Sequence, residues 1–416
     1  MEQDRQAELS KLVTAPRVIT SLQPLNVITD GAVGIRDGRI DWVGPIAQAR
    51  RGDYSHVVRV AGTVLPGLID AHVHLGFDAG QEKPDGPLLG NNPDQLRQVI
   101  LSNGSRLLAS GVTSVRDLGS RAGSVLSVGS DIAQGRATGP TVVAADQPLT
   151  RRRGHAWSYG IEIGSAAEAT ASVRLLAARG VGVVKVMVTG GRMTLGTDPE
   201  AVELPPTLLR AVADAAHAEQ LPVAAHCLSA AGIRAALTAG VDTLEHCTFI
   251  DPGGQPCSED DALRLADAIA DAGAYVCPTI NVHYPGRHPI SFEQRLHWVS
   301  LLHRAGVRLI VGNDIGIPGL PPELYIGALL ALEAAGMSRP EVLHAATALP
   351  AQAMGVERNG GTLRPGARAD LVAVNGDPLS DLETLREPTV VVARGRTVVD
   401  VERPDTVDFP AVRLDC

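Results

Sequence analysis

Lysine is scarce in this sequence: Lys11, Lys83 and Lys185 are the three lysines among 416 residues, and arginine supplies the other basic side chains. The formal net charge is −9 and the isoelectric point is near 5.7. An acidic chain argues against nucleic acid or an anionic membrane as the main partner. We therefore expect a small-molecule substrate, with neither nucleic acid nor a membrane as partner, and self-association into a homo-oligomer stays open.

Cysteines are also few, and long apolar runs are missing. The five cysteines form no CxxC pair, so a disulfide framework is not expected and a reducing compartment is the simpler interpretation. No uncharged apolar stretch approaches the roughly 18 residues of a membrane span. Residues 1–12 are polar and charged, without the apolar segment of a secretory signal. These absences predict a cytoplasmic protein.

Short β-rich runs occupy both ends of the chain, and hydrophobic residues, at 44%, are numerous enough to build a large core. The N-terminal runs cover residues 17–20, 31–36, 39–43 and 57–60, and the C-terminal runs cover residues 370–374, 389–393 and 397–401.

Strand and helix signals alternate between these ends. The expected strands are residues 64–74, 113–118, 141–145, 183–189, 223–226, 243–246, 274–279 and 308–314. Residues 205–218 and 229–239 are examples of the helices between them, and Gly240, Gly273 and Gly306 close helices just before strands. Eight such units predict an α/β fold, a TIM-like (β/α)8 barrel, with a doubly wound open sheet as the alternative.

Two histidines end the first of these strands. His72 and His74 lie two residues apart in PGLIDAHVHL, so in a strand both imidazoles point to the same face. The pair could be two histidines on a solvated strand face. Because the preceding segment is apolar and should be buried, a metal ion explains them better.

Lys185 interrupts the apolar run VVKVMV, which is typical of a strand buried on both faces. An unpaired lysine there would bear a large desolvation penalty or become neutral. A neutral amine near metal ions can react with carbon dioxide to give a carbamate that bridges two cations. An internal ion pair, or a strand end that reaches solvent, is the alternative.

Further potential ligands follow other strands: His226, His246 and Asp314 each end one. Each histidine alone could be a core residue, and Asp314 could cap a helix. The active face of such a barrel lies at the carboxyl ends of its strands, so five strand ends with potential ligands indicate a metal site.

This order, HxH after strand 1, Lys after strand 4, His after strands 5 and 6 and Asp after strand 8, resembles the binuclear amidohydrolase superfamily. The run KVMVTGG at 185–191 is similar to the imidazolonepropionase-like branch, which includes Xaa-Pro and Xaa-Arg dipeptidases. The resemblance implies a small β-sandwich domain built from residues 1–62 and 355–416, and a barrel hydrolase domain built from residues 63–354.

The resemblance also implies a site for two divalent metal ions, with zinc the best expectation. One metal would be held by His72, His74, Asp314 and the carboxylated Lys185, and the other by that carbamate, His226 and His246. A metal-bridging hydroxide would then attack an amide C–N bond, with Asp314 as the catalytic acid and base. The expected substrate is a dipeptide, an N-acyl amino acid or a related small amide.

Two alternatives within the superfamily are a mononuclear deaminase and a cyclic-amide hydrolase of the imidazolonepropionase type. Neither explains Lys185, and a deaminase usually carries a Glu where Ser229 stands. A scaffold that has lost its chemistry would lack ligands, and none of the six is missing.

Candidate substrate residues lie on loops that follow the strands. The resemblance implies that His155, after strand 3, lies near the substrate carbonyl and is catalytic as well as substrate-binding. Arg192, or the basic run at 151–153, could meet a substrate carboxylate, and His283 and Tyr284 could line the same cavity. The dipeptidase pocket itself is in question, because Leu228 replaces a second histidine and Asn313-Asp314-Ile315 replaces Thr-Asp-Ala.

Overall fold

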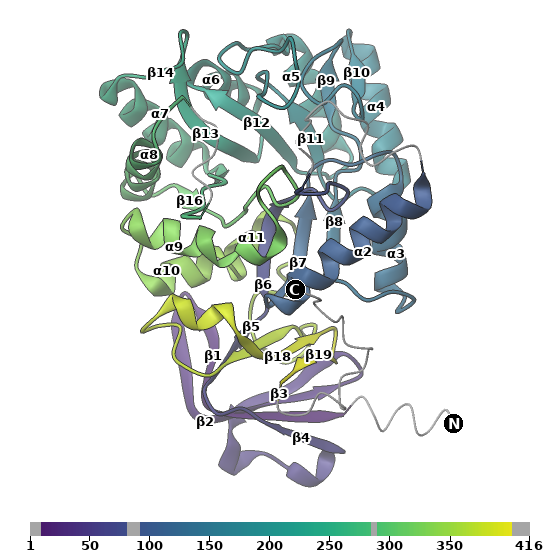
Figure 1. The fold of residues 1–416 in the computed structure, drawn as a ribbon, viewed down its shortest axis with the longest axis vertical. Coiled ribbons are helices and arrows are strands. Elements are labelled where there is room, and N and C mark those ends of the chain that lie inside the picture. Colours follow the sequence, from purple (N-terminus) through teal and green to yellow (C-terminus); the bar gives the residue numbers. More distant parts are fainter. Residues whose placement is uncertain (1–9, 81–91, 284–288, 402–416) are drawn as a thin grey trace.

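The computed structural model describes residues 10–80, 92–283 and 289–401. One sheet made from both ends of the chain lies below a larger part in which strands and helices alternate (Figure 1). None of the helices in these ranges combines the length and the apolar character needed to cross a membrane.

The terminal sheet contains eight strands among the described residues, in the order β19-β18-β17-β5-β1-β2-β3, with β4 paired to β1. Its strands are β1 (Lys11–Leu22), β2 (Leu25–Arg36), β3 (Arg39–Pro45), β4 (His56–Arg59), β5 (Thr63–Pro66), β17 (Leu371–Val374), β18 (Pro388–Ala393) and β19 (Arg396–Asp400). β5 brings the two ends together, because it pairs in parallel with β1 and antiparallel with β17. The predicted short strands at both termini are therefore confirmed as parts of one sheet.

The larger part contains two arcs of parallel strands. β6 (Leu68–Val73), β7 (Val112–Asp117) and β8 (Thr141–Ala144) form the first arc. The second arc runs β10-β9-β11-β12-β13-β15-β16, and the short β14 pairs antiparallel with β13. Its bounds are β9 (Leu149–Arg151), β10 (Ile161–Ile163), β11 (Val184–Met187), β12 (Val223–Ser229), β13 (Thr243–Asp251), β14 (Gln255–Pro256), β15 (Tyr275–Cys277) and β16 (Arg308–Leu309).

Backbone hydrogen bonds join the two arcs at both ends. Ala71 donates to the carbonyl of Val311 over 2.9 Å, and Gly182 donates to the carbonyl of Ala144 over 3.0 Å. The residues of β11 and β12 are buried throughout, as expected for parallel strands covered on both faces. Parallel strands alternating with helices confirm the predicted α/β class.

Helices cover the outside of these arcs (Figure 1). They are α2 (Pro93–Ala109), α3 (Ser124–Ala133), α4 (Ala166–Arg179), α5 (Pro206–Ala218), α6 (Ala230–Ala239), α7 (Glu259–Ala272), α8 (Phe292–Arg304), α9 (Ile326–Ala334), α10 (Arg339–Ala345) and α11 (Ala348–Ala353). Serine side chains cap the first turns of α4, α6, α7 and α8, which satisfies backbone N–H groups that have no partner within the helix. Left-handed Gly240 and Gly273 end α6 and α7, as predicted. Four short 3₁₀ turns, Ile46–Gln48, Arg51–Asp53, Pro322–Leu324 and Leu382–Arg386, complete the described elements.

The prediction of one strand over residues 64–74 is wrong. The segment divides at Gly67 into β5, which belongs to the terminal sheet, and β6, which begins the first arc. The N–H of Gly67 donates to Asp370 on the terminal side, whereas the N–H of Leu68 donates to Gly111. A β-carbon at Gly67 would lie 2.2 Å from the Thr113 hydroxyl oxygen, so only glycine allows the chain to pass between the two parts here.

Candidate active site

A cavity of about 170 Å³ opens among the ends of the parallel strands. Its lining includes all six predicted metal ligands and two predicted substrate residues: His72, His74, Lys185, His226, His246, Asp314, His155 and Arg192. β6, β11, β12 and β13 carry the four ligands that lie within strands, and the other two come directly after β6 and a few residues after β16. The strand-end positions inferred from the sequence therefore meet in one place.

Three of the predicted ligands converge most closely. The Nε2 atoms of His72 and His74 lie 3.3 and 3.1 Å from the same oxygen of Asp314, Oδ1. That oxygen is buried and accepts no hydrogen bond from any residue that the structure describes. Ligand atoms of His72, His246 and Asp314 all lie within 4.8 Å of one another. Two imidazoles and a carboxylate oxygen at such distances suit a divalent cation of the zinc type.

In each of the four predicted histidine ligands, one ring nitrogen is already hydrogen-bonded to another part of the protein. Nδ1 of His72 bonds to Glu245, Nδ1 of His74 to the carbonyl of Gly119 and Nδ1 of His246 to Thr279, over 2.7, 3.0 and 2.7 Å. His226 is reversed, because its Nε2 lies 3.0 Å from the carbonyl of Gly190. Such partners fix the ring orientation and leave the opposite nitrogen available to a metal. The rings of His226 and His246 are 4.6 Å apart, so the second predicted pair is also adjacent.

Lys185 lies in the same cavity and is only 1% exposed. Burial lowers the pKa of its amine, although the nearby Glu245 carboxylate acts in the opposite direction. Within the described residues the amine makes no hydrogen bond or ion pair, so the internal ion-pair alternative finds no support there. A buried amine with a lowered pKa has the chemistry that carbamate formation requires.

Two of the ligand positions have an unusual backbone. His246 and Asp314 have φ angles of 73° and 62°, a left-handed conformation that costs energy for residues with a side chain. Burial alone would raise the pKa of Asp314, but the imidazoles of His72 and His74 outweigh it and hold that pKa well below its usual value. Asp314 is therefore ionised at neutral pH and can act as a ligand or a base.

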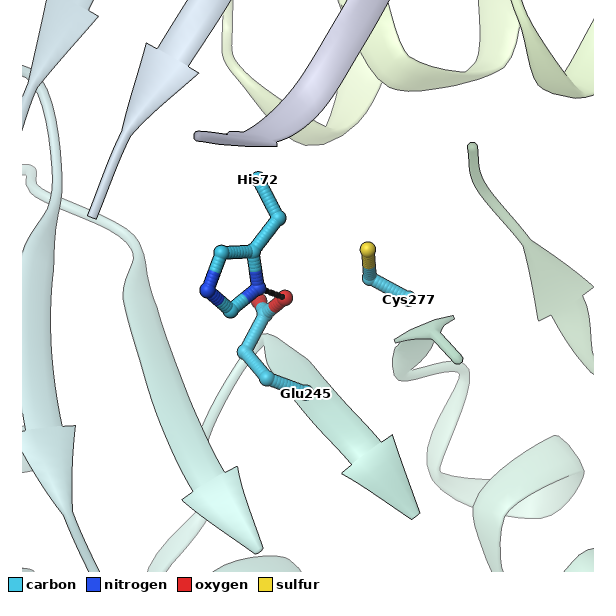
Figure 2. Close-up of side chains that lie close together, drawn as sticks. All are labelled: His72, Glu245 and Cys277. Atoms are coloured by element: carbon cyan, nitrogen blue, oxygen red, sulfur yellow. Dashed lines mark hydrogen bonds and ion pairs between the residues drawn. The ribbon is translucent and has the colours of Figure 1, made fainter. Parts of the chain in front are cut away.

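Glu245 and Arg116 support the site and were missed by the sequence reasoning. The two side chains are fully buried and 2.8 Å apart, and Glu245 also accepts the hydrogen bond from His72 (Figure 2). Burial would raise the pKa of Glu245, but Arg116 and His72 lower it to about 2. Cys277 lies beside this pair, yet burial raises its thiol pKa well above the usual value, so it remains a neutral neighbour. The sequence did contain a signal for these two residues, because each is a charged side chain inside a strand that should be buried.

The predicted substrate residues fall in different places. His155 is buried in the cavity, and burial with the nearby Lys185 lowers its pKa to about 4. Arg192 is an exposed lining residue. His283 is exposed and does not line the cavity, because its Nε2 is bound by Arg386 of the 3₁₀ turn Leu382–Arg386. Tyr284 lies outside the described residues.

The basic run at 151–153 is absent from the cavity lining. Arg151 pairs with Glu203 and Arg152 with Glu168, while Arg153 lies over the ring of Trp157. These contacts account for the three arginines without a role in substrate binding.

Comparison with known proteins decides the family. Residues 63–398 match the amidohydrolase family. The chain belongs to this family. Ochratoxinase of Aspergillus niger is 27% identical over 399 residues, covering 88% of this chain and 81% of that protein. Imidazolonepropionase of Maricaulis maris is 26% identical over 397 residues, covering 88% and 92%.

A solved Xaa-Pro dipeptidase with bound methionine has the same fold, with a TM-score of 0.80 at 24% identity, and covers 93% of this chain and 99% of its own. The predicted relationship to the amidohydrolases is confirmed. The chain is a hydrolase of this family, and the prediction of C–N bond hydrolysis agrees with these relatives.

Proposed function

We propose that this amidohydrolase cleaves an amide bond with two divalent metal ions bridged by a carboxylated Lys185. The convergence of His72, His74 and Asp314 on one point beside that buried amine is the observation that carries the proposal. Carboxylation would join the amine nitrogen to carbon dioxide with loss of one proton. The resulting anion would relieve the cost of a buried lysine and supply two oxygen ligands.

The ligand set would divide into two groups, with His246 close to both of them. His72, His74 and Asp314 would hold one ion, and His226 and His246 would hold the other. The carboxylated Lys185 would bind both ions. Zinc suits the imidazole and carboxylate donors. When bound, the two cations would supply Lewis acidity, lowering the pKa of a water molecule and polarising the scissile carbonyl.

The remaining steps belong to side chains of the chain itself. Asp314, ionised because of its two imidazole neighbours, would take the proton released when water attacks and deliver it to the leaving nitrogen. His155, neutral in its buried position, would donate a hydrogen bond toward the carbonyl oxygen.

The cavity lining supports a substrate that combines an apolar group with an anion. Met187, Leu228 and Leu320 line its apolar side, and the cationic Arg192 lines it too. A dipeptide or an N-acyl amino acid fits this combination. The names of ochratoxinase and the Xaa-Pro dipeptidase point in the same direction.

We also propose how the two parts of the fold are built, as a closed barrel and a β-sandwich. The two arcs would complete a closed (β/α)8 barrel, supported by the backbone bonds of Ala71 and Gly182, and the terminal sheet would fold over its own core as a β-sandwich. A cytoplasmic location, a small-molecule substrate and self-association stay predictions.

Metal analysis of the purified protein tests the site. We expect nearly two equivalents in the wild type and a loss of tightly bound metal in Lys185→Ala, because the bridge is gone. Lys11→Ala is the matched control, since Lys11 lies in the terminal sheet. Two ions still tightly bound to Lys185→Ala would overturn the bridge.

Activity screening separates the proposed reaction from its relatives. Dipeptides and N-acyl amino acids should be hydrolysed with zinc or manganese added. One equivalent of metal together with deamination of an amine substrate, or opening of a cyclic amide, would favour the alternative mononuclear chemistry.

A further inference from the structure

The loop that carries His155 is held by a second loop from another strand. His155 lies between β9 and β10, and its neighbour Ala156 has a φ of 64°. Thr194, in the loop after β11, contacts both residues. Its hydroxyl oxygen accepts the N–H of Ala156 over 3.1 Å and lies 3.0 Å from Nδ1 of His155. Thr194 therefore both secures a strained turn and contacts the imidazole.

The hydrogen bonds determine which nitrogen of His155 carries the proton. The hydroxyl oxygen of Thr194 already accepts the N–H of Ala156. Within the described residues, Nδ1 of His155 is the acceptor within reach of the Thr194 hydroxyl proton. If Nδ1 carried the proton instead, the buried hydroxyl would donate to nothing, which is unfavourable. His155 is buried and bonds to no carboxylate within the described ranges, and burial without an anionic partner favours the neutral ring. A neutral ring with an accepting Nδ1 has its proton on Nε2.

The ring of His155 lies in the cavity beside a predicted metal ligand, and its Nε2 has no hydrogen-bond partner among the described residues. The ring of His155 is 4.8 Å from that of His226. Gly191 lies against the ring, and a β-carbon there would approach Nε2 to 2.4 Å. His155 also lines the cavity, and Nε2 bonds to no described residue.

We propose that Thr194 is a positioning residue that holds His155 in the Nε2–H tautomer, so that this histidine donates to the carbonyl oxygen of the substrate amide. The proposal rests on amide hydrolysis as the function. Thr194 also lines the cavity, and in the proposal it acts on the reaction through the imidazole of His155. Fixing a histidine tautomer through the hydrogen bond at its other nitrogen is an established way to set its role.

Nitrogen NMR of the full-length protein with labelled histidine tests the tautomer directly. The His155 signals are assigned by their loss in His155→Gln. We expect the Nε2–H form in the wild type and in Thr194→Ser, which keeps the hydroxyl, and a shift toward Nδ1–H in Thr194→Val. Thr197→Val is the matched control, because Thr197 bonds to Gly191 and Thr194 backbone atoms in the same loop without touching His155.

Kinetics provide the second readout. Thr194→Val should lower kcat by roughly ten- to a hundredfold, less than the loss of a donor outright, with KM changed little. Thr194→Ser should restore the rate, and in a His155→Gln background Thr194→Val should have no further effect.

An Nδ1–H signal in the wild type, or an unchanged tautomer and kcat in Thr194→Val, would overturn the proposal. The spectra need no substrate. Absence of amide hydrolysis by the wild type would therefore refute the proposed function while leaving the tautomer measurement intact.

Discussion

Several ionisable side chains lie in the strands around the cavity with almost no exposure, among them Lys185, Arg116 and Glu245. Arg116 and Glu245 neutralise each other at 2.8 Å, and His72 shares the carboxylate. Lys185 has no such partner among the described residues. Burying an uncompensated charge is costly, so a chemical role explains Lys185 better than a structural one.

Asp314 is the residue whose chemistry is easiest to separate from its ligand role. Asp314→Asn keeps a side-chain oxygen beside His72 and His74 but removes the base. We expect metal content to persist and kcat to fall about 10²- to 10⁴-fold, the usual contribution of a general acid or base. Paired metal analysis and steady-state kinetics measure this, with Asp251→Asn as a control outside the cavity lining. Turnover at the wild-type rate would exclude Asp314 as the base.

Asp70 predicts a pH dependence of stability. Burial raises its pKa to about 8, although the N–H groups of His72 and Asn313 oppose this by donating to Oδ1. The unfolded chain loses that proton near the ordinary value of 3.8. Between these values the folded state binds more protons, so the contribution of Asp70 to stability is full below pH 4 and is lost as the pH rises toward 8.

Asp70→Asn keeps the Oδ1 acceptor and cannot ionise. Relative to this variant, the free energy of unfolding of the wild type should fall between pH 5 and pH 8, by up to about 1.4 kcal/mol per pH unit. Denaturant unfolding of both proteins at several pH values gives the difference. Parallel pH profiles would show that Asp70 ionises normally.

At the scale of elements, most of the parallel strands and the two helices that were placed are predictable from the sequence. α5 and α6 begin within one residue of the expected positions because proline and serine mark their starts. β9 and β10 could not be found, since three-residue strands carry no periodicity. β5 and β6 read as one apolar run, because the pairing that separates them involves Asp370 and Gly111, distant in the sequence.

Prediction from the sequence has the same limit at the candidate site, because contacts between distant residues leave no local pattern. The six ligand positions follow from strand ends, but Thr194 and Glu245 act through contacts that no local pattern specifies. His283 was placed near the cavity because it follows a strand. Its contact with Arg386 joins residues 103 positions apart in the sequence, so no local pattern predicts it.

The packing of α6 against the end of β11 depends on one small residue. A β-carbon at Gly232 would lie 2.4 Å from the Cγ2 methyl of Thr189. Gly232→Ala gains about 1 kcal/mol of helix propensity, yet we expect a net loss of stability, since overpacking typically costs about 1–3 kcal/mol and no space is free here.

Thr189→Ser provides the test of this cause. It removes the methyl group and keeps the hydroxyl that bonds to Gly190 and Leu228. Stability should recover in the double variant, and denaturant midpoints of all four proteins give the coupling. Additive losses would place the strain elsewhere.

At the scale of the whole molecule, part of the terminal sheet packs into the same core as the elements of the two arcs. Ile19, Leu65 and Val372 of the terminal sheet belong to the same buried cluster as Leu107 and Val112. Arg368 adds a polar link, because it pairs with Asp370 and donates to the Ser114 hydroxyl over 2.8 Å. A shared core of this kind couples the unfolding of its two sides.

Two tryptophans can report on the two parts separately. Trp42 lies in β3 of the terminal sheet, and Trp298 is buried in α8 beside Phe249. Variants that keep only one of them, with Trp157 also replaced by Phe, should unfold at the same denaturant concentration, because separating the shared core would expose apolar surface on both sides. Fluorescence of the two variants measures this, and circular dichroism of each corrects for any stability lost with the substitutions. A Trp42 transition well before the Trp298 transition would mean that the terminal sheet unfolds alone, and that the two arcs of parallel strands do not depend on it for their stability.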